Sequence, residues 1–195
     1  MTGLAVPAPP LPTMPPPWSV RVVEPDSADV AIVHGWMHHP AIARFWKQTW
    51  TLEEWSEKVR RHLSGSHTIP LLFSRNGIPL VYTQVYRVAL DRIGEFYRYH
   101  PHDLGVHVTV DPGSIGAGLM EDVAPAIIDA LFAADPECRR IIGEPNATNA
   151  AAVRSAAAFG FTPVGRITLP DKTAELMVRP RTPEDTITPD LLLRS

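Results

Sequence analysis

A glycine-rich turn between a strand pattern and a helix pattern lies near the middle of this 195-residue chain. Residues 104–110 (LGVHVTV) predict a strand, and the turn from Gly113 to Gly118 leads into a helix expected to end near Ala134. Such a turn can point backbone N–H groups at an anion, and the helix start adds the positive end of its dipole. The segment therefore favours a phosphate-binding loop, or else a tight turn whose glycines only satisfy a positive φ.

The rest of the chain alternates between strand and helix patterns. Strands are predicted over 19–24, 69–74, 78–88, 140–143, 164–168 and 174–178, and helices over 27–37, 51–63 and 149–159. A capping box from Thr51 to Glu54 opens the second helix, and Asn76-Gly77 is the strongest short hairpin signal. This order predicts an α/β fold with one mixed sheet and helices on both of its faces.

The two ends of the chain differ in composition from this central part. Residues 1–17 are rich in proline, which removes backbone donors and breaks helices, so we expect a disordered tail, with a docking role as the alternative. Residues 182–195 are expected to form a second tail, whose final leucines suit folding back onto the domain or onto a partner. A single domain is therefore placed at residues 18–181.

Charge and cysteine content exclude several classes of function. The net charge is −3 and the 18 basic residues are scattered, which argues against a nucleic-acid or membrane-surface partner. The single cysteine, Cys138, allows no internal disulfide, and no cysteine–histidine cluster has metal-ligand spacing. Neither a signal peptide nor a membrane-spanning run is visible. We expect a cytoplasmic protein without a bound metal.

The order of elements around the glycine-rich turn resembles that of the GNAT acyltransferases. Their acyl-CoA loop has the form Gln/Arg-x-x-Gly-x-Gly/Ala, and the matching stretch here runs from Gly113 to Gly118. Its last two glycines match, whereas the leading Gln/Arg is absent. The resemblance implies a GNAT fold, with a mixed central sheet splayed between strands 4 and 5, and acyl-CoA as co-substrate. It places cofactor binding at Val108, Val110, Gly116, Ala117, Gly118 and Asn149.

Four further stretches resemble the siderophore-biosynthesis branch of that family, the lysine and diamine N-hydroxy acyltransferases of aerobactin, mycobactin and desferrioxamine type. They are Trp36-Met37 with Phe45-Trp46 and Trp50; Tyr82-Thr-Gln-Val-Tyr86 with Asp91; Asp103-Leu-Gly-Val-His107; and Gly143-Glu-Pro-Asn146 with Asn149, Gly160-Phe161 and Leu169-Pro-Asp-Lys172. The chain departs from the family at Gln84, where Glu is frequent, and at Asn146, where Asp is frequent.

The resemblance implies transfer of an acyl group from acyl-CoA to the hydroxylated side-chain amine of N6-hydroxylysine or a related N-hydroxy-diamine, giving a hydroxamate. The expected partners are this small hydroxylamine and either siderophore-pathway enzymes or an acyl carrier protein. Two alternatives stay open at this point. One is an aminoglycoside or other small-amine N-acetyltransferase, and the other is a non-catalytic acyl-CoA-binding module.

Direct acyl transfer requires a base for the attacking nitrogen and a donor for the tetrahedral oxyanion. His107 is the predicted base, because imidazole can accept a proton near neutral pH; the alternative is a strand histidine that only hydrogen-bonds. The resemblance places the acidic partner of His107 at Glu144, which ends the next predicted strand and would lie beside His107 in a parallel pair. The alternative is a carboxylate that stabilises the dipole of the following helix. The backbone amide of Val108 or of a neighbouring residue is the expected oxyanion donor. Asn149 would bind the pantetheine arm or cap its helix.

Aromatic and amide side chains supply a predicted amine pocket. Tyr86 and Gln84 share one face of their strand with Tyr82, because residues two apart point the same way. Trp46 and Trp50 are four residues apart and would share a helix face, either in the core or as the wall of the pocket. We assign substrate binding to Trp46, Gln84 and Tyr86.

Overall fold

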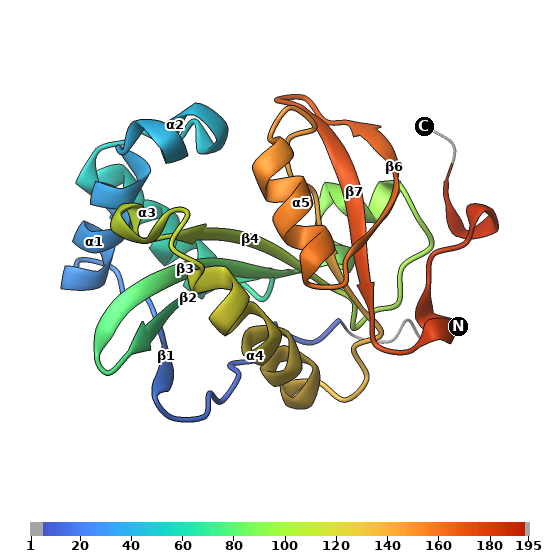
Figure 1. Cartoon of the computed structure of the whole chain (residues 1–195), viewed down its shortest axis with the longest axis horizontal. Coiled ribbons are helices and arrows are strands. Elements are labelled where there is room, and N and C mark those ends of the chain that lie inside the picture. Colours follow the sequence, from blue (N-terminus) through green and yellow to red (C-terminus); the bar gives the residue numbers. More distant parts are fainter. Residues whose placement is uncertain (1–5, 194–195) are drawn as a thin grey trace.

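The computed structural model describes residues 6–193, which fold around one seven-stranded sheet with strand order β1-β2-β3-β4-β5-β7-β6 (Figure 1). The strands are β1 (Trp18–Val22), β2 (Thr68–Arg75), β3 (Ile78–Arg87), β4 (Leu104–Val110), β5 (Arg140–Gly143), β6 (Thr162–Thr168) and β7 (Thr173–Pro180). Neighbouring strands are antiparallel except for β4 and β5, which are parallel. The sheet is therefore mixed, as the sequence predicts.

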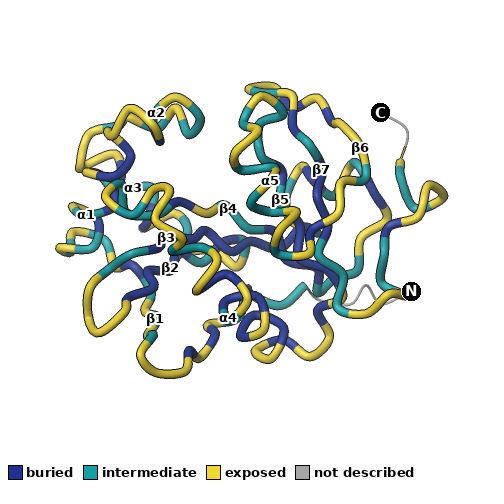
Figure 2. The backbone as a smooth tube through the Cα atoms, viewed as in Figure 1, coloured by how far each residue is buried: buried dark blue, intermediate teal, exposed yellow. Residues whose placement is uncertain are grey.

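Helices cover both faces of this sheet. They are α1 (Ala28–Met37), α2 (Pro40–Trp46), α3 (Leu52–Ser64), α4 (Leu119–Ala134) and α5 (Ala150–Ala158). Apolar residues of α4 and α5 pack in the main core against one face, while α1 and α3 enclose a second core with residues of the opposite face, such as Leu72 and Tyr82. Figure 2 shows the buried backbone concentrated in the central strands between these layers.

The parallel strands β4 and β5 are paired over a short length only. Leu104 pairs with Ile141 and Gly105 with Ile142, whereas residues 106–110 of β4 continue beside β3 alone. Since an unpaired strand edge leaves alternate backbone groups free, this end of β4 can offer amides to a ligand. The predicted splay between strands 4 and 5 is confirmed.

Local signals placed several elements accurately. Thr51 caps α3 and completes its capping box with Glu54, and the hairpin between β2 and β3 turns at Asn76-Gly77, both with positive φ. The short helix α2 was missed, although proline at its first position is a favoured helix start. Lys47 ends α2 in the left-handed conformation, so the prediction that Trp46 and Trp50 share one helix face is wrong.

Both terminal segments lie against the domain. Arg87 donates hydrogen bonds to the backbone oxygens of Pro7 and Ala8, and Met14 is buried in the main core. The structure therefore differs from a loose tail for residues 6–17, because proline leaves carbonyl acceptors that a buried guanidinium can bind; residues 1–5 lie outside the described residues. At the other end, Ile187 is buried and Leu192 bridges to Tyr97.

Among residues 6–193, the helices are too short or too polar to cross a membrane.

Candidate active site

His107 and Glu144 meet where β4 and β5 separate. His107 lies two residues beyond the last β4–β5 pair, and Glu144 directly follows β5. The imidazole Nε2 contacts the carboxylate Oε1 of Glu144. The His107 side chain is 35% exposed, whereas that of Glu144 is 3% exposed. The pair thus joins a buried carboxylate to an imidazole that solvent and ligands can reach.

Three groups hold the carboxylate of Glu144. Besides His107, the Tyr86 hydroxyl donates to Oε2 at 2.9 Å, and the Lys172 ammonium lies 3.7 Å from Oε1. Lys172 also donates to the backbone oxygen of Glu144 at 2.7 Å. Burial opposes ionisation of Glu144, but the positive charges of His107 and Lys172 and the hydrogen bonds outweigh it, so its pKa is lowered. An ionised Glu144 stabilises a protonated His107.

Gly105 lets Tyr86 reach Glu144 across β4. The two residues are directly opposite each other on β3 and β4, and a Cβ atom at Gly105 would overlap the Tyr86 ring. Burial and the nearby Glu144 charge raise the Tyr86 pKa well above its usual value, so the hydroxyl remains a donor. Sequence reasoning gave Gly105 no role, although a glycine inside a strand signals close approach of another group. It also assigned none to Lys172.

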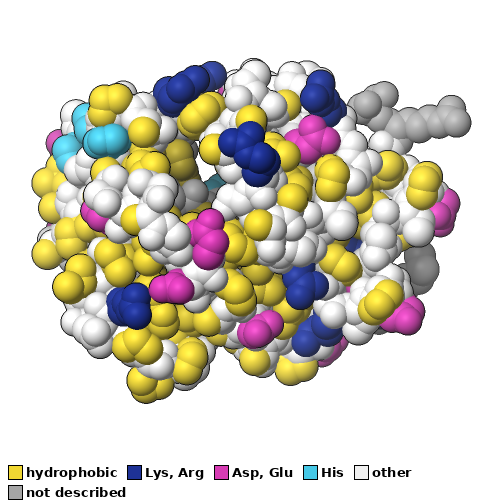
Figure 3. Space-filling view, viewed as in Figure 1, with side chains coloured by type: hydrophobic (Ala, Val, Ile, Leu, Met, Phe, Trp, Pro, Cys, Tyr) yellow, Lys and Arg dark blue, Asp and Glu magenta, His cyan; other side chains and the backbone are white. Residues whose placement is uncertain are grey.

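The three predicted amine-pocket residues differ in how closely they approach the exposed side of His107. Trp46 packs edge-on against His107, with ring centroids 6.1 Å apart, and therefore forms a wall beside the imidazole. Gln84 lies directly opposite His107 on β3, but its side chain is buried and donates to the Tyr82 hydroxyl at 3.1 Å. Tyr86 is buried behind His107, and its hydroxyl donates a hydrogen bond to Glu144. Figure 3 shows a hollow in this face between α2 and α5.

The glycine-rich turn has the backbone form expected of an anion-binding loop. Gly116 and Gly118 have φ of +78° and +76°, and the space where their Cβ atoms would lie is open. Gly118 is the N-cap of α4, whose first N–H groups lack intrahelical acceptors. The N–H of Ala117 instead donates to Ser114 within the turn. The residues present therefore fit a diphosphate, with Gly118 and the α4 start as its donors.

The other predicted cofactor-binding residues flank this turn. Val108 is exposed in the part of β4 that β5 does not cover, and Val110 packs against the main core. The side-chain oxygen of Asn149 accepts from the backbone N–H of Ala152, which makes Asn149 the N-cap of α5. That cap uses the side-chain oxygen Oδ1 and leaves the side-chain NH2 group of Asn149 available as a donor.

Comparison with known proteins gives the family to which this fold belongs. Residues 26–169 match the family model for the acetyltransferase (GNAT) domain. The chain is 34% identical over 182 residues to the lysine N-acyltransferase MbtK of Mycobacterium sp. (strain MCS), covering 93% of this chain and 74% of that protein. It therefore belongs to the GNAT acetyltransferase family. More particularly, it is an acyl-CoA-dependent N-acyltransferase.

Two further similar proteins differ from each other in the amine that their names give as substrate. The N(6)-hydroxylysine O-acetyltransferase of Escherichia coli is 27% identical, over 84% of this chain and 52% of that enzyme, so the chain spans about half its length. The aminoglycoside acetyltransferase AAC(6')-Ib, solved with coenzyme A and kanamycin, superposes with a TM-score of 0.74 at 26% identity, over 84% of this chain and 95% of that one.

Proposed function

We propose that this enzyme transfers an acyl group from acyl-CoA to the hydroxylated side-chain amine of N6-hydroxylysine or a related N-hydroxy-diamine, forming a hydroxamate for siderophore biosynthesis. The observation that carries the proposal is the His107–Glu144 pair at the splay of β4 and β5, beside the indole of Trp46. The similarity to a lysine N-acyltransferase and to a hydroxylysine acetyltransferase supports this acceptor class.

The pair is suited to general base catalysis. With Nε2 bonded to Glu144, Nδ1 of His107 is the nitrogen that can accept a proton from the attacking amine. The nitrogen lone pair forms the new C–N bond at the thioester carbonyl, whose π electrons move onto oxygen. Collapse of this tetrahedral intermediate breaks the C–S bond, and the CoA thiolate leaves and takes up a proton. The ionised Glu144 stabilises the imidazolium that exists between these steps.

The main chain would hold the donor. Backbone amides at Gly116 and Gly118 and the start of α4 would bind the diphosphate of CoA. The free edge of β4 near Val108 and Val110 would bind the pantetheine arm and the thioester oxygen, with the amide group of Asn149 as a further donor. A carrier protein presents the same phosphopantetheine arm without the nucleotide, so comparison of the two donors tests how much the turn contributes.

The alternative acceptor class is an aminoglycoside. The structural likeness to AAC(6')-Ib speaks for it, since both chains share the fold. A site for a polycation requires several carboxylates facing the ligand. In the part of the chain that the structure describes, the carboxylate at the splay is Glu144, which is buried and already bonded to His107, Tyr86 and Lys172. The site therefore fits a hydroxylamine better.

Release of free CoA tests the proposal directly. Purified protein with acetyl-CoA should release thiol in the presence of N6-hydroxylysine, N5-hydroxyornithine or N-hydroxycadaverine, and mass spectrometry should detect the hydroxamate. If kanamycin supports release of CoA and none of the three hydroxylamines does, the aminoglycoside alternative is favoured. Binding of acyl-CoA without turnover of any amine would instead indicate a binding module.

A further inference from the structure

Helix α3 carries a lysine on the side that faces the aromatic residues of the site. The Lys58 ammonium lies 4.9 Å from the ring of Trp50 and 5.8 Å from that of Trp55. Trp55 is buried and packs edge-on against Tyr82, whose hydroxyl accepts from Gln84. One layer of aromatic side chains therefore lies between Lys58 and β3, the strand on which Gln84 pairs with His107.

The face of α3 that carries Lys58 packs toward the sheet. Trp55, Lys58 and His62 are spaced three and four residues apart, so they lie along one face of the helix. Trp55 meets Tyr82, while burial, the charge of Lys58 and more weakly those of His67, Arg61 and His107 lower the pKa of His62 to about 3. Tyr82 in turn packs against Trp46, whose ring lies 6.1 Å from that of His107, so a continuous layer of aromatic side chains connects this helix face to the candidate site.

Lys58 has no acidic partner of its own within residues 6–193. The nearby acids of α3 are engaged elsewhere, since Glu57 pairs with Arg60 and Glu54 completes the capping box. Burial, together with the Arg61 charge, lowers the Lys58 pKa to about 8, so most of the side chain stays charged at neutral pH. A partly buried cation without a counter-ion attracts an anionic ligand strongly.

Two further polar atoms in this region lack a hydrogen-bond partner among residues 6–193. Among the described residues, Gln48 Oε1 and His62 Nδ1 are buried and make no hydrogen bond. Gln48 adjoins Trp55, whose indole N–H donates to its backbone oxygen at 3.2 Å. Buried polar atoms are normally satisfied, so two unsatisfied atoms from residues around Trp55 favour a polar ligand in this region.

We infer that Lys58 and His62 bind the carboxylate of an amino-acid acceptor, so that the enzyme prefers N-hydroxylysine or N-hydroxyornithine to the corresponding N-hydroxy-diamine. This inference rests on the proposed function and narrows it. A carboxylate at the far end of a dicarboxylic acyl group has the same chemistry, and the two sources are separable because one travels with the acceptor and the other with the donor.

The test uses two acceptors that differ only in the carboxylate, N6-hydroxylysine and N-hydroxycadaverine. With acetyl-CoA, we expect wild type to prefer hydroxylysine in kcat/KM. Lys58→Met should raise the KM for hydroxylysine about 10- to 100-fold, the usual worth of a charge-assisted hydrogen bond, and leave hydroxycadaverine nearly unchanged. Lys58→Arg should restore part of the preference because it keeps the charge. Arg60→Met, on the exposed side of the same helix, is the matched control and should change neither acceptor.

Three results would overturn the inference. Equal loss for both acceptors in Lys58→Met would make Lys58 a structural residue. An effect confined to succinyl-CoA, absent with acetyl-CoA, would assign the carboxylate to the donor. An unchanged preference in a folded Lys58→Met, checked by thermal unfolding, would remove Lys58 from acceptor binding while the proposed function stands. Absence of CoA release by wild type with every hydroxylamine would instead defeat the proposed function, and this inference with it.

Discussion

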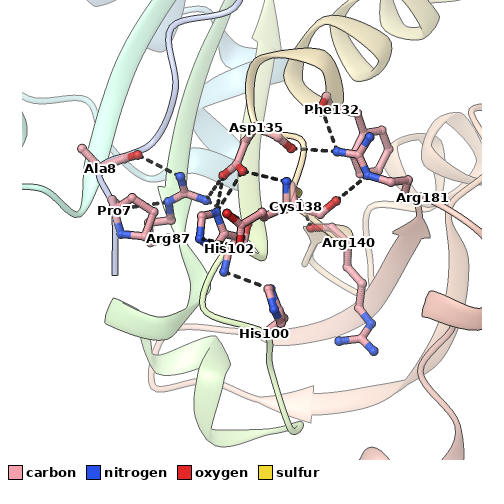
Figure 4. Close-up of polar contacts among 11 residues, drawn as sticks. Pro7, Ala8, Arg87, His100, His102, Phe132, Asp135, Cys138, Arg140 and Arg181 are labelled. Carbon is pink, nitrogen blue, oxygen red and sulfur yellow. Dashed lines mark hydrogen bonds and ion pairs between the residues drawn. The ribbon is translucent and has the colours of Figure 1, made fainter. Parts of the chain in front are cut away.

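Two buried polar clusters lie on opposite faces of the same strand. Tyr86 and Arg87 are consecutive residues of β3, so their side chains point to opposite sides of the sheet. Tyr86 joins the His107–Glu144 pair, whereas Arg87 enters a second cluster with Asp135 and His102 (Figure 4). Both clusters combine a carboxylate, a histidine and a cation, yet the side chain of His107 is 35% exposed and that of His102 is 18% exposed.

The second cluster is closed by the protein itself. Arg87 Nη1 lies 2.7 Å from Asp135 Oδ2, and the two side chains are 2% and 8% exposed. The same guanidinium donates to the backbone oxygens of His102, Pro7 and Ala8, while His102 Nδ1 lies 2.9 Å from Asp135. Arg181 closes the edge by donating to the backbone oxygens of Phe132 and Asp135. These bonds tie β3 and the end of α4 to residues 7 and 8 and to Arg181, which follows β7.

The first cluster is open on one side. Glu144 is fully enclosed by Tyr86, Lys172 and His107, but a third of the His107 side chain reaches the surface. A closed cluster uses its hydrogen-bonding capacity to hold the fold, whereas an open one keeps a group free for a substrate. The comparison implies that substitutions in the two clusters affect different measurements.

The largest expected effect is on turnover. His107→Ala should lower kcat about 10²- to 10⁴-fold, the range that a general base contributes, and leave CoA affinity nearly unchanged. Steady-state kinetics and calorimetric CoA binding measure the two quantities. An unchanged kcat would remove His107 from the chemistry and make both clusters structural.

The closed cluster should respond in stability. Asp135→Ala leaves the buried Arg87 charge unpaired and should reduce the free energy of unfolding by about 3–5 kcal/mol, with kcat per folded molecule preserved. Denaturant unfolding measures the loss. Asp122→Ala is the control, because its exposed pair with Arg75 should contribute about 0–1 kcal/mol. Similar losses in both variants would contradict the closed description.

Tyr86→Phe sharpens the comparison through pH. It removes a hydrogen bond to a charged carboxylate and should cost about 1.5–3 kcal/mol of unfolding free energy at pH 7. The lowered pKa of Glu144 means that its stabilisation is present above the usual value near 4.5 and is lost as pH falls through the lowered pKa. The difference between wild type and variant should therefore shrink below pH 4.5. A constant difference down to pH 3 would show that Glu144 is not ionised.

The smallest effect separates two roles of Asn149. Asn149→Ala should cost about 1 kcal/mol of stability because it removes the cap of α5, whereas Asn149→Ser keeps a capping oxygen. If the amide also binds the donor, both variants should raise the KM for acyl-CoA. Normal KM values in the serine variant would leave Asn149 as a helix cap alone.

Local sequence patterns determined most of the elements. The alternation in residues 104–110, the short apolar run at 140–143, the capping box at Thr51 and the Asn-Gly turn each depend on neighbours within a few residues. The family resemblance, together with the order of these elements, predicted Glu144 as the partner of His107, and the two side chains are in contact. The catalytic role of that pair stays a prediction.

Only the tertiary structure decided which side chains complete the two clusters. Tyr86 reaches Glu144 because strand pairing sets it over Gly105, and Lys172 arrives from the β6–β7 turn, 28 residues beyond Glu144. Arg87 fastens residues 7 and 8, about 80 residues earlier, although proline content alone predicted a free tail. Such contacts depend on the register of distant strands and on the burial of charge, and neither is encoded in a local window of sequence.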